Sequence, residues 1–224
     1  MKQNQSIILF VSSLVFSSSA LASIYVNGGG GVTDGTVRYL ELGTPQYHSI
    51  GEVNGVGQLG IGVDGHWNKL YTALEYGYEW QGFDAGQTAT ISDTVTGASM
   101  TAIQSTNLMH DYYVHAKSGY VYNDTVIAYG LAGVVRGYFN YSDVTGDLGN
   151  KPGPEYHTWK TGYRLGVGVS NLVKNHFEWR LEYTFNSYAP IYSVLVDPHG
   201  GPNIDYKRTH INLSQVLFGI GYHF

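Results

Sequence analysis

Histidine, serine and acidic side chains are the residues of this chain that could carry out hydrolysis. In such chemistry a histidine activates a hydroxyl nucleophile and a carboxylate orients the histidine. The nine histidines include one candidate pair, His210 and Ser214, which lie four residues apart and so on one face of a strand. No acidic residue stands where it would orient His210, and no histidine spacing matches a zinc site. We therefore predict no catalytic residue, no bound metal and no cofactor.

Composition excludes several further classes. The chain has no cysteine, which rules out a cysteine nucleophile, cysteine-ligated metals and disulfides. Charged residues make up 13% of the chain and the net charge is −5, so no basic nucleic-acid surface is expected. Lys2, the apolar run of residues 7–16 and Ala20-Leu21-Ala22 predict a secretory signal peptide over residues 1–22, cleaved after Ala22. Residues 23–224 then form one domain.

Apolar and polar residues alternate along most of the remaining chain, which indicates β-strands with two different faces. Eight strands are predicted, and three tight connections (Asn68-Lys69, Asn123-Asp124 and 172–174) alternate with four long ones (33–50, 81–106, 142–157 and 189–208). The predicted strands are Ile24–Val32, Gly51–Trp67, Leu70–Trp80, Asn107–Tyr122, Thr125–Tyr141, Thr158–Ser170, His176–Tyr188 and Thr209–Phe224. Short turns at one end and long loops at the other are typical of transmembrane up-and-down antiparallel barrels, with turns in the periplasm and loops outside.

The two faces predict which side meets lipid. In Thr125–Tyr141 the face with Ile127, Tyr129, Leu131, Val135 and Phe139 is interpreted as lipid-facing, which puts Arg136 inside. Across the strands, five basic and six acidic residues fall on the polar faces, and placing them in hydrocarbon would cost roughly 2–4 kcal/mol for each Arg or Lys. A soluble barrel of lipocalin type, with the apolar face inside, is the alternative. We favour the membrane barrel, with structural lumen ion pairs among Glu75, Asp111, Lys117, Arg136, Arg164, Arg180 and Glu182.

Turn positions predict two specific pairs. A two-residue turn at Asn123-Asp124 places Asp111 opposite Arg136. A hairpin centred on Val173 places Arg164 opposite Glu182. The inward-pointing His66, His115 and His223 are expected to be satisfied lumen residues, and Leu217 also points inward. The four glycines of Gly28–Gly31 leave the phase of the first strand ambiguous.

The chain resembles the small eight-stranded outer-membrane barrels of the OmpA-like and OmpX-like kind, within the porin family of outer-membrane β-barrel domains. The resemblance rests on Gly55–Gly62, Leu74–Tyr78, Tyr163–Gly168, Trp179–Tyr183 and the terminal Val216–Phe224. It implies a monomer in the cell outer membrane of a Gram-negative bacterium. It also implies that Tyr222 and Phe224 contribute to the signal read by the barrel-assembly machinery. The aromatic girdle at the two membrane interfaces is predicted at Trp67, Trp80, Trp159 and Trp179.

The resemblance leaves three functions open: a structural or surface-interaction role, a lipid A-modifying enzyme and a small porin. Deacylases on such barrels use a His-x-Ser arrangement, which this chain lacks. Eight strands enclose no aqueous channel. We therefore expect a plugged lumen, with adhesion or envelope integrity as the role and a host or surface ligand bound through the long loops. Residues 88–97 could form an exposed hairpin, and Lys207 and Arg208 are candidates for contacting lipopolysaccharide phosphates.

Overall fold

The computed structural model describes residues 22–40, 47–92, 99–123, 125–145, 155–173, 176–195 and 205–224. The predicted signal peptide, apart from Ala22, lies outside these residues. All regular structure within them is antiparallel β-strand: β1 (Ala22–Leu40), β2 (Tyr47–Trp67), β3 (Leu70–Ser92), β4 (Ser99–Tyr122), β5 (Val126–Thr145), β6 (Glu155–Val173), β7 (Phe177–Tyr188), β8 (Ile191–Leu195) and β9 (Asp205–His223). No helix in the described part of the chain is long and apolar enough to cross a membrane.

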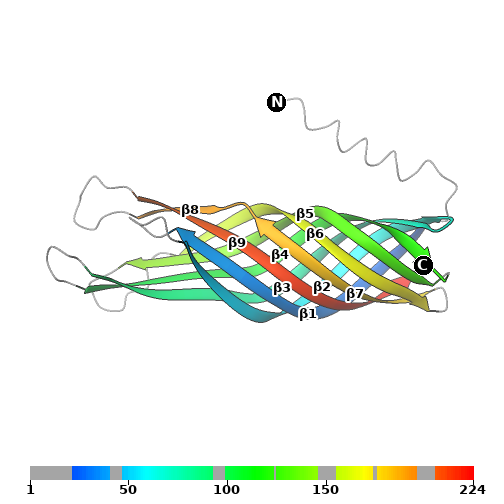
Figure 1. Ribbon diagram of the computed structural model, residues 1–224, viewed down its shortest axis with the longest axis horizontal. Coiled ribbons are helices and arrows are strands. Elements are labelled where there is room, and N and C mark those ends of the chain that lie inside the picture. Colours follow the sequence, from blue (N-terminus) through cyan, green and yellow to red (C-terminus); the bar gives the residue numbers. More distant parts are fainter. Residues whose placement is uncertain are drawn as a thin grey trace, which may run out of the picture.

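The strands form one closed barrel (Figure 1). Each of the strands β1 to β6 pairs with the next strand in the chain, and β1 closes the sheet by pairing with β9 from Tyr25↔His223 to Tyr39↔Thr209. β7 and β8 both pair with β9 and follow each other along it, interrupted at Ala189 and Pro190. Because proline has no N–H to donate to a ladder, the break falls there. The wall therefore has eight strand positions, which confirms the predicted all-β, eight-stranded, up-and-down architecture.

The two ends of the barrel differ (Figure 1). The end with the three short turns is called the turn end, and the opposite end, where long β-hairpins project, is called the hairpin end. Asn68 and Asn123 have φ values of 53° and 50°, the left-handed conformation that asparagine tolerates in tight turns. The alternation of short and long connections is thus confirmed, but the long loops were predicted too long. β3 and β4, for example, stay paired as far as Ser92↔Ser99.

In the half of the barrel nearer the turn end, the outer face of the wall is apolar and the inner face is largely polar. On β9 the outward side chains are Val216, Phe218, Ile220 and Tyr222, and Ile220 is 65% exposed, whereas inward Leu217 is fully buried. On β3, Tyr76 and Trp80 are exposed while Glu75 and Glu79 are fully buried. This arrangement is the reverse of a soluble barrel at this level, so the lipocalin alternative is wrong.

The predicted faces of β5 are wrong. The five side chains predicted to face lipid are buried inside the barrel: Ile127, Tyr129, Leu131, Val135 and Phe139. Arg136, predicted to lie inside, is exposed on the outside. The reason lies in the turn, because Tyr122 pairs with Val126 and the connection therefore has three residues rather than two. A register shift of one residue moves every side chain of a strand to the other face. The first strand, β1, has Tyr25, Asn27 and Val37 inside.

The barrel wall divides into two sheets at the hairpin end. Pairing of β2 with β3 stops at Val56↔Gln81, and pairing of β6 with β7 stops at Gly162↔Tyr188. Beyond those positions the described strands continue as two four-stranded sheets, β8-β9-β1-β2 and β3-β4-β5-β6. An apolar cluster, called the hairpin-end core, fills the space between them: Val37, Phe83, Ala85, Leu108, Tyr113, Val135, Phe139, Tyr188, Ile191, Ile211 and Leu213, all buried.

The polarity of both faces inverts where the two sheets begin. The outward face of β9 changes from Val216 to Ser214, and its inward face changes from Gln215 to Leu213. On β3, outward Trp80 gives way to Gly82 and Asp84, while inward Gln81 gives way to Phe83. The hairpin-end half therefore has an apolar interior and a polar exterior, which is the pattern of a β-sandwich in water.

Candidate functional site

Glu75 is the centre of the polar lumen. Its carboxylate accepts hydrogen bonds from Arg180 Nη1 at 2.7 Å, Lys117 Nζ at 2.9 Å, and the hydroxyls of Tyr25 at 2.8 Å and Tyr113 at 2.9 Å. These donors come from β1, β4 and β7, while Glu75 lies on β3. A fully buried carboxylate held by two cations and two hydroxyls satisfies the requirement that buried charges be paired and hydrogen-bonded.

Glu182 extends this network across the lumen. Lys117 Nζ lies 2.7 Å from Glu182 Oε1, and the Tyr129 hydroxyl donates to the same oxygen at 2.6 Å. Lys117 thus bridges Glu75 and Glu182, and Arg180 Nε is 3.9 Å from Glu182. Tyr129 comes from the face of β5 that the sequence placed in lipid. Its inward position supplies a donor that the predicted faces did not include.

A second polar layer lies nearer the hairpin end. Arg164 Nη1 is 2.7 Å from Glu79 Oε1, and its guanidinium lies over the Tyr113 ring at 4.3 Å. Asp111 accepts hydrogen bonds from Tyr188 at 2.7 Å and from Gln81 at 2.8 Å. The described lumen buries six carboxylates but only three Lys or Arg side chains, because Arg136 points outward and Lys160 is only half-buried. The predicted near balance of charges is therefore wrong.

Both specific pairs predicted from the turns are wrong. Asp111 lies opposite Gly137, not Arg136, because of the three-residue turn. Arg164 lies opposite Asn186, and Glu182 lies opposite Gly168, because the third hairpin is centred two residues later than predicted. That second shift leaves the faces unchanged, so Arg164 and Glu182 still point inward. Of the seven side chains predicted for the lumen, six are buried: Glu75, Asp111, Lys117, Arg164, Arg180 and Glu182.

A third cluster at the turn end was missed by sequence reasoning. His223 Nε2 lies 2.9 Å from Glu178, and its Nδ1 lies 3.2 Å from Ser23 Oγ. These three residue types are those of a hydrolytic triad, but Ser23 Oγ donates a hydrogen bond to Asp64. The hydroxyl proton is thus engaged by a carboxylate. Because Ser23 and His223 are 200 residues apart, only the β1–β9 closure brings them together.

The described residues contain no group of three or more His, Asp or Glu side chains arranged to hold a metal ion. His115 stacks on Tyr113 with ring centroids 4.9 Å apart and lies 3.8 Å from Glu75. His66 lies 4.0 Å from Asp64. The prediction of satisfied lumen histidines holds only for His223, which is hydrogen-bonded to Glu178. Buried His115 has no hydrogen-bond partner among the described residues on either ring nitrogen, and His66 is exposed.

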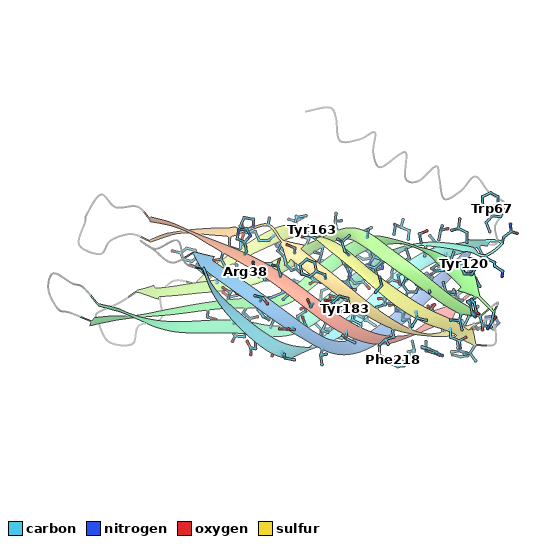
Figure 2. All side chains as sticks on the ribbon, in the orientation of Figure 1. Arg38, Trp67, Tyr120, Tyr163, Tyr183 and Phe218 are labelled. Atoms are coloured by element: carbon cyan, nitrogen blue, oxygen red, sulfur yellow. The ribbon has the colours of Figure 1, made fainter. Side chains whose placement is uncertain are left out.

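The predicted girdle and assembly residues are on the outside of the barrel. All four tryptophans are exposed, with Trp67 beside a turn (Figure 2) and Trp179 also near the turn end, whereas Trp80 and Trp159 lie where the polarity inverts. Tyr222 and Phe224 face outward at the end of β9. The side chains of Lys207 and Arg208 lie outside the described residues. In the predicted hairpin 88–97, residues 88–92 are described as paired backbone only, and residues 93–97 lie outside the described residues.

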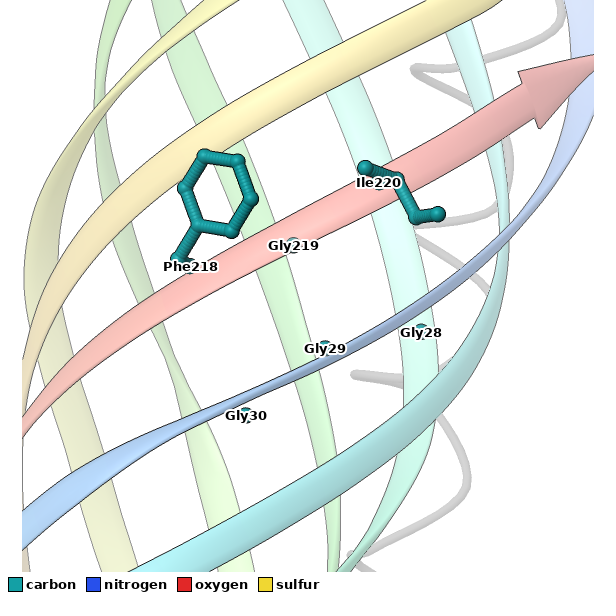
Figure 3. A pocket seen from close by; sticks show the side chains of 6 residues that line it. All are labelled: Gly28, Gly29, Gly30, Phe218, Gly219 and Ile220. Carbon is teal, nitrogen blue, oxygen red and sulfur yellow. The ribbon is translucent and has the colours of Figure 1, made fainter.

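A shallow hollow interrupts the outer apolar surface beside β9 (Figure 3). It is lined by Gly28, Gly29 and Gly30 of β1 and by Phe218, Gly219 and Ile220 of β9. The glycines have no side chains to fill the surface, and their backbones approach β9 closely. A Cβ on Gly31 would overlap the carbonyl oxygen of Val216. Glycine has a low β-propensity, but this segment needs it because a side chain would prevent the close approach of β1 to β9 that closes the barrel.

The family described as Outer membrane protein beta-barrel domain matches residues 8–224. This chain belongs to that family. The outer membrane is therefore its location, and the apolar outer face of the barrel is the face that meets lipid. Among proteins of curated function, none matches the sequence.

Several solved outer-membrane proteins are similar to this chain in structure. The outer membrane protease OmpT from Escherichia coli is 13% identical, with a TM-score of 0.51, over 90% of this chain and 97% of that one. The attachment invasion locus protein Ail of Yersinia pestis, solved with the heparin analogue sucrose octasulfate, is 16% identical with a TM-score of 0.40, over 89% and 99%. OprG from Pseudomonas aeruginosa is 12% identical with a TM-score of 0.49, over 92% and 97%. At these identities the likeness concerns the fold alone.

Proposed function

We propose that this outer-membrane barrel is a surface-interaction protein that acts through the two sheets at its hairpin end, with a sealed lumen. The observation that carries the proposal is that β1 to β6 and β9 continue beyond the apolar belt and, together with β8, form two sheets with polar outer faces. These sheets present ordered backbone and polar side chains to the medium outside the cell. A barrel that served only to span the membrane could end where the apolar belt ends.

The filled lumen argues against a pore. Three layers close it: the turn-end cluster around His223, the polar network around Glu75 and Glu79, and the hairpin-end core. Arg164, Arg180, Phe83 and Phe139 are among the largest fully buried side chains. We expect refolded protein in planar bilayers to show no stable conductance steps, and steady single-channel currents would favour the small-porin alternative.

The lipid A-modifying alternative depends on the turn-end triad or on another hydroxyl near a histidine. The turn end faces the periplasm in barrels of this topology. We expect lipid A mass spectra from cells with and without the gene to be identical. A mass change that disappears in the Ser23→Ala variant would assign catalysis to the turn-end cluster.

The main test removes one projecting hairpin and leaves the barrel intact. Because Gly86 pairs with Ser105, replacing residues 87–104 by Asn-Gly makes a register-matched short turn. We expect this variant to keep heat-modifiable gel migration and to lose cell–cell or cell–surface attachment. Attachment equal to that of wild type, together with increased detergent sensitivity in the gene deletion, would instead support a purely structural envelope role.

A further inference from the structure

A dense set of aromatic and cationic side chains covers the outside of β3–β6 where the polarity inverts. We call it the aromatic–cationic patch: Tyr78, Trp80, His110, Tyr112, Arg136, Tyr138, His157 and Trp159. The strand register arranges all of these except His157 in two adjacent rows. Trp80, His110, Tyr138 and Trp159 are paired across four strands, and Tyr78, Tyr112 and Arg136 form the next row toward the turn end.

The patch is packed as one unit on the outer surface. Tyr138 stacks on His110 at 5.2 Å and on His157 at 5.7 Å between ring centroids. Trp159 lies 5.0 Å from Tyr138 and 5.4 Å from His110. These contacts fix the rings before any ligand arrives, so binding to the patch would lose little side-chain entropy.

Arg136 is held in this patch without a carboxylate partner. Its guanidinium carbon lies 5.3 Å from the Trp159 ring, within the range of a cation–π contact. No ion pair joins Arg136 to an acidic side chain of the described residues. A guanidinium on an aromatic face keeps its in-plane N–H donors available, and their geometry matches a phosphate oxygen pair.

The depth of the patch selects the kind of ligand. Toward the turn end the outward face continues as Val134 and Tyr76, which belong to the lipid-facing belt, whereas toward the hairpin end it continues as polar residues such as Asn140. Trp80 and Trp159 occupy the level where amphipathic rings anchor barrels at a membrane interface. A molecule that covers the patch must therefore be apolar on one side and anionic on the other.

We propose that the aromatic–cationic patch binds the phosphorylated headgroup of a glycolipid of the outer leaflet. Arg136 donates two hydrogen bonds to a phosphate, His110 and His157 offer ring N–H donors beside it, and the acyl chains lie along the belt below. The proposal goes beyond the surface-interaction function and does not depend on it. It also places the lipid contact elsewhere than Lys207 and Arg208.

The test uses full-length refolded protein and measures binding to lipid A in mixed detergent micelles by native mass spectrometry. Arg136→Gln is expected to lower the affinity for lipid A by roughly tenfold or more, because a charge-assisted bidentate contact is lost. Arg38→Gln is the matched control, an exposed arginine on β1 near the hairpin end (Figure 2), and should leave the affinity unchanged. Lipid A without its phosphates should have the same affinity for the wild-type protein as for the Arg136→Gln variant.

Three outcomes would overturn the proposal. Equal affinity of wild type and Arg136→Gln, with both folded by heat-modifiable migration, would remove Arg136 from the contact. Loss only in the Lys207→Ala/Arg208→Ala double variant would move the site to the rim. Full competition by millimolar inorganic phosphate would show a site for a soluble anion instead of a lipid headgroup.

Discussion

Glu75 receives donors from three other strands, so it connects parts of the wall that are far apart in sequence. The sequence separation from Glu75 is 50 residues for Tyr25, 42 for Lys117 and 105 for Arg180. A buried ion pair is weak evidence for net stability relative to an apolar core. Removing one partner is a different matter, because the remaining charges stay buried without compensation.

Glu75→Gln should therefore destabilise the barrel strongly. Arg180 and Lys117 would keep only Glu182 as a carboxylate partner, and the expected loss in free energy of unfolding is about 3–5 kcal/mol. Urea unfolding in detergent, followed by tryptophan fluorescence, measures it. Asp34→Asn, an exposed carboxylate on β1, is the control and should change the free energy by less than about 0.5 kcal/mol. A Glu75→Gln value inside that same margin would contradict the role given to Glu75.

Residue identity could predict most lumen side chains, since charged residues such as Glu75 and Arg180 alternate along their strands with apolar and aromatic residues that face outward. Arg136 could not be placed in this way. Its strand carries apolar residues on both faces, with Ile127, Tyr129 and Leu131 on one and Ala132 and Val134 on the other. Only the length of the turn at Asn123 decides between them, and one residue of turn length is not encoded in alternation.

At the scale of elements, β1 and β9 close the barrel through glycine backbones. Gly31 has no space for a side chain, because a Cβ there would overlap the Val216 carbonyl. The same segment had an ambiguous phase in sequence, since four consecutive glycines carry no alternation. The closing contact decides the phase, and it joins residues from opposite ends of the chain.

Gly31→Leu should prevent closure. The expected result is loss of the heat-modifiable folded band after refolding into detergent. Gly55→Leu on β2 is the matched control, because a Cβ added at Gly55 would have no atom within 4 Å and would meet open space. Normal folding of Gly31→Leu would show that β1 and β9 can separate enough to admit a side chain.

The hairpin-end core is the element that holds the two projecting sheets together. Phe83 is fully buried in it, while Asp84, the next residue on β3, points outward. Truncating a buried phenylalanine costs about 3–5 kcal/mol in a packed core. The sequence did not reveal this core, because four of its residues fall within stretches interpreted as loops and two others, Val135 and Phe139, were predicted to face lipid.

Phe83→Ala should loosen the projecting sheets and leave the membrane-level barrel closed. Limited proteolysis of intact cells is expected to cut the variant faster at the hairpin end, with heat-modifiable migration retained. Asp84→Ala should be cut at the wild-type rate. Equal cutting of both variants would mean that the hairpin-end core contributes little to order outside the membrane.

The whole molecule lies partly in the hydrocarbon of the membrane and partly in water. The polarity of the inner and outer faces of the barrel wall inverts at the boundary between the two. The β9 strand passes from Ile220 in the lipid-facing belt to Ser214 beyond it. The number of strands, the order of turns and the lipid-facing side of β3, β6, β7 and β9 were all predictable from alternation. The division into two sheets was not, because it depends on where pairing between β2 and β3 stops.

Lysine substitution along β9 should report this boundary. Phe218→Lys, in the middle of the apolar run of β9, is expected to cost about 2–4 kcal/mol of folding free energy, and Ser214→Lys about 0–1 kcal/mol, when refolding is measured in lipid vesicles. Both substitutions add the same charge on the same face of one strand, so each serves as a control for the other. Equal costs at the two positions would place the edge of the hydrocarbon elsewhere.

The seam between the two sheets has a consequence for amide protection. Below Gln81 the wall is a continuous ring of backbone hydrogen bonds, so opening any strand breaks ladders on both of its sides. Above it, the described β2 and β3 each have a single neighbour, and side-chain packing joins the two sheets along this seam. Deuterium uptake should therefore rise in a step, not a slope, along β3 between Gln81 and Asp84.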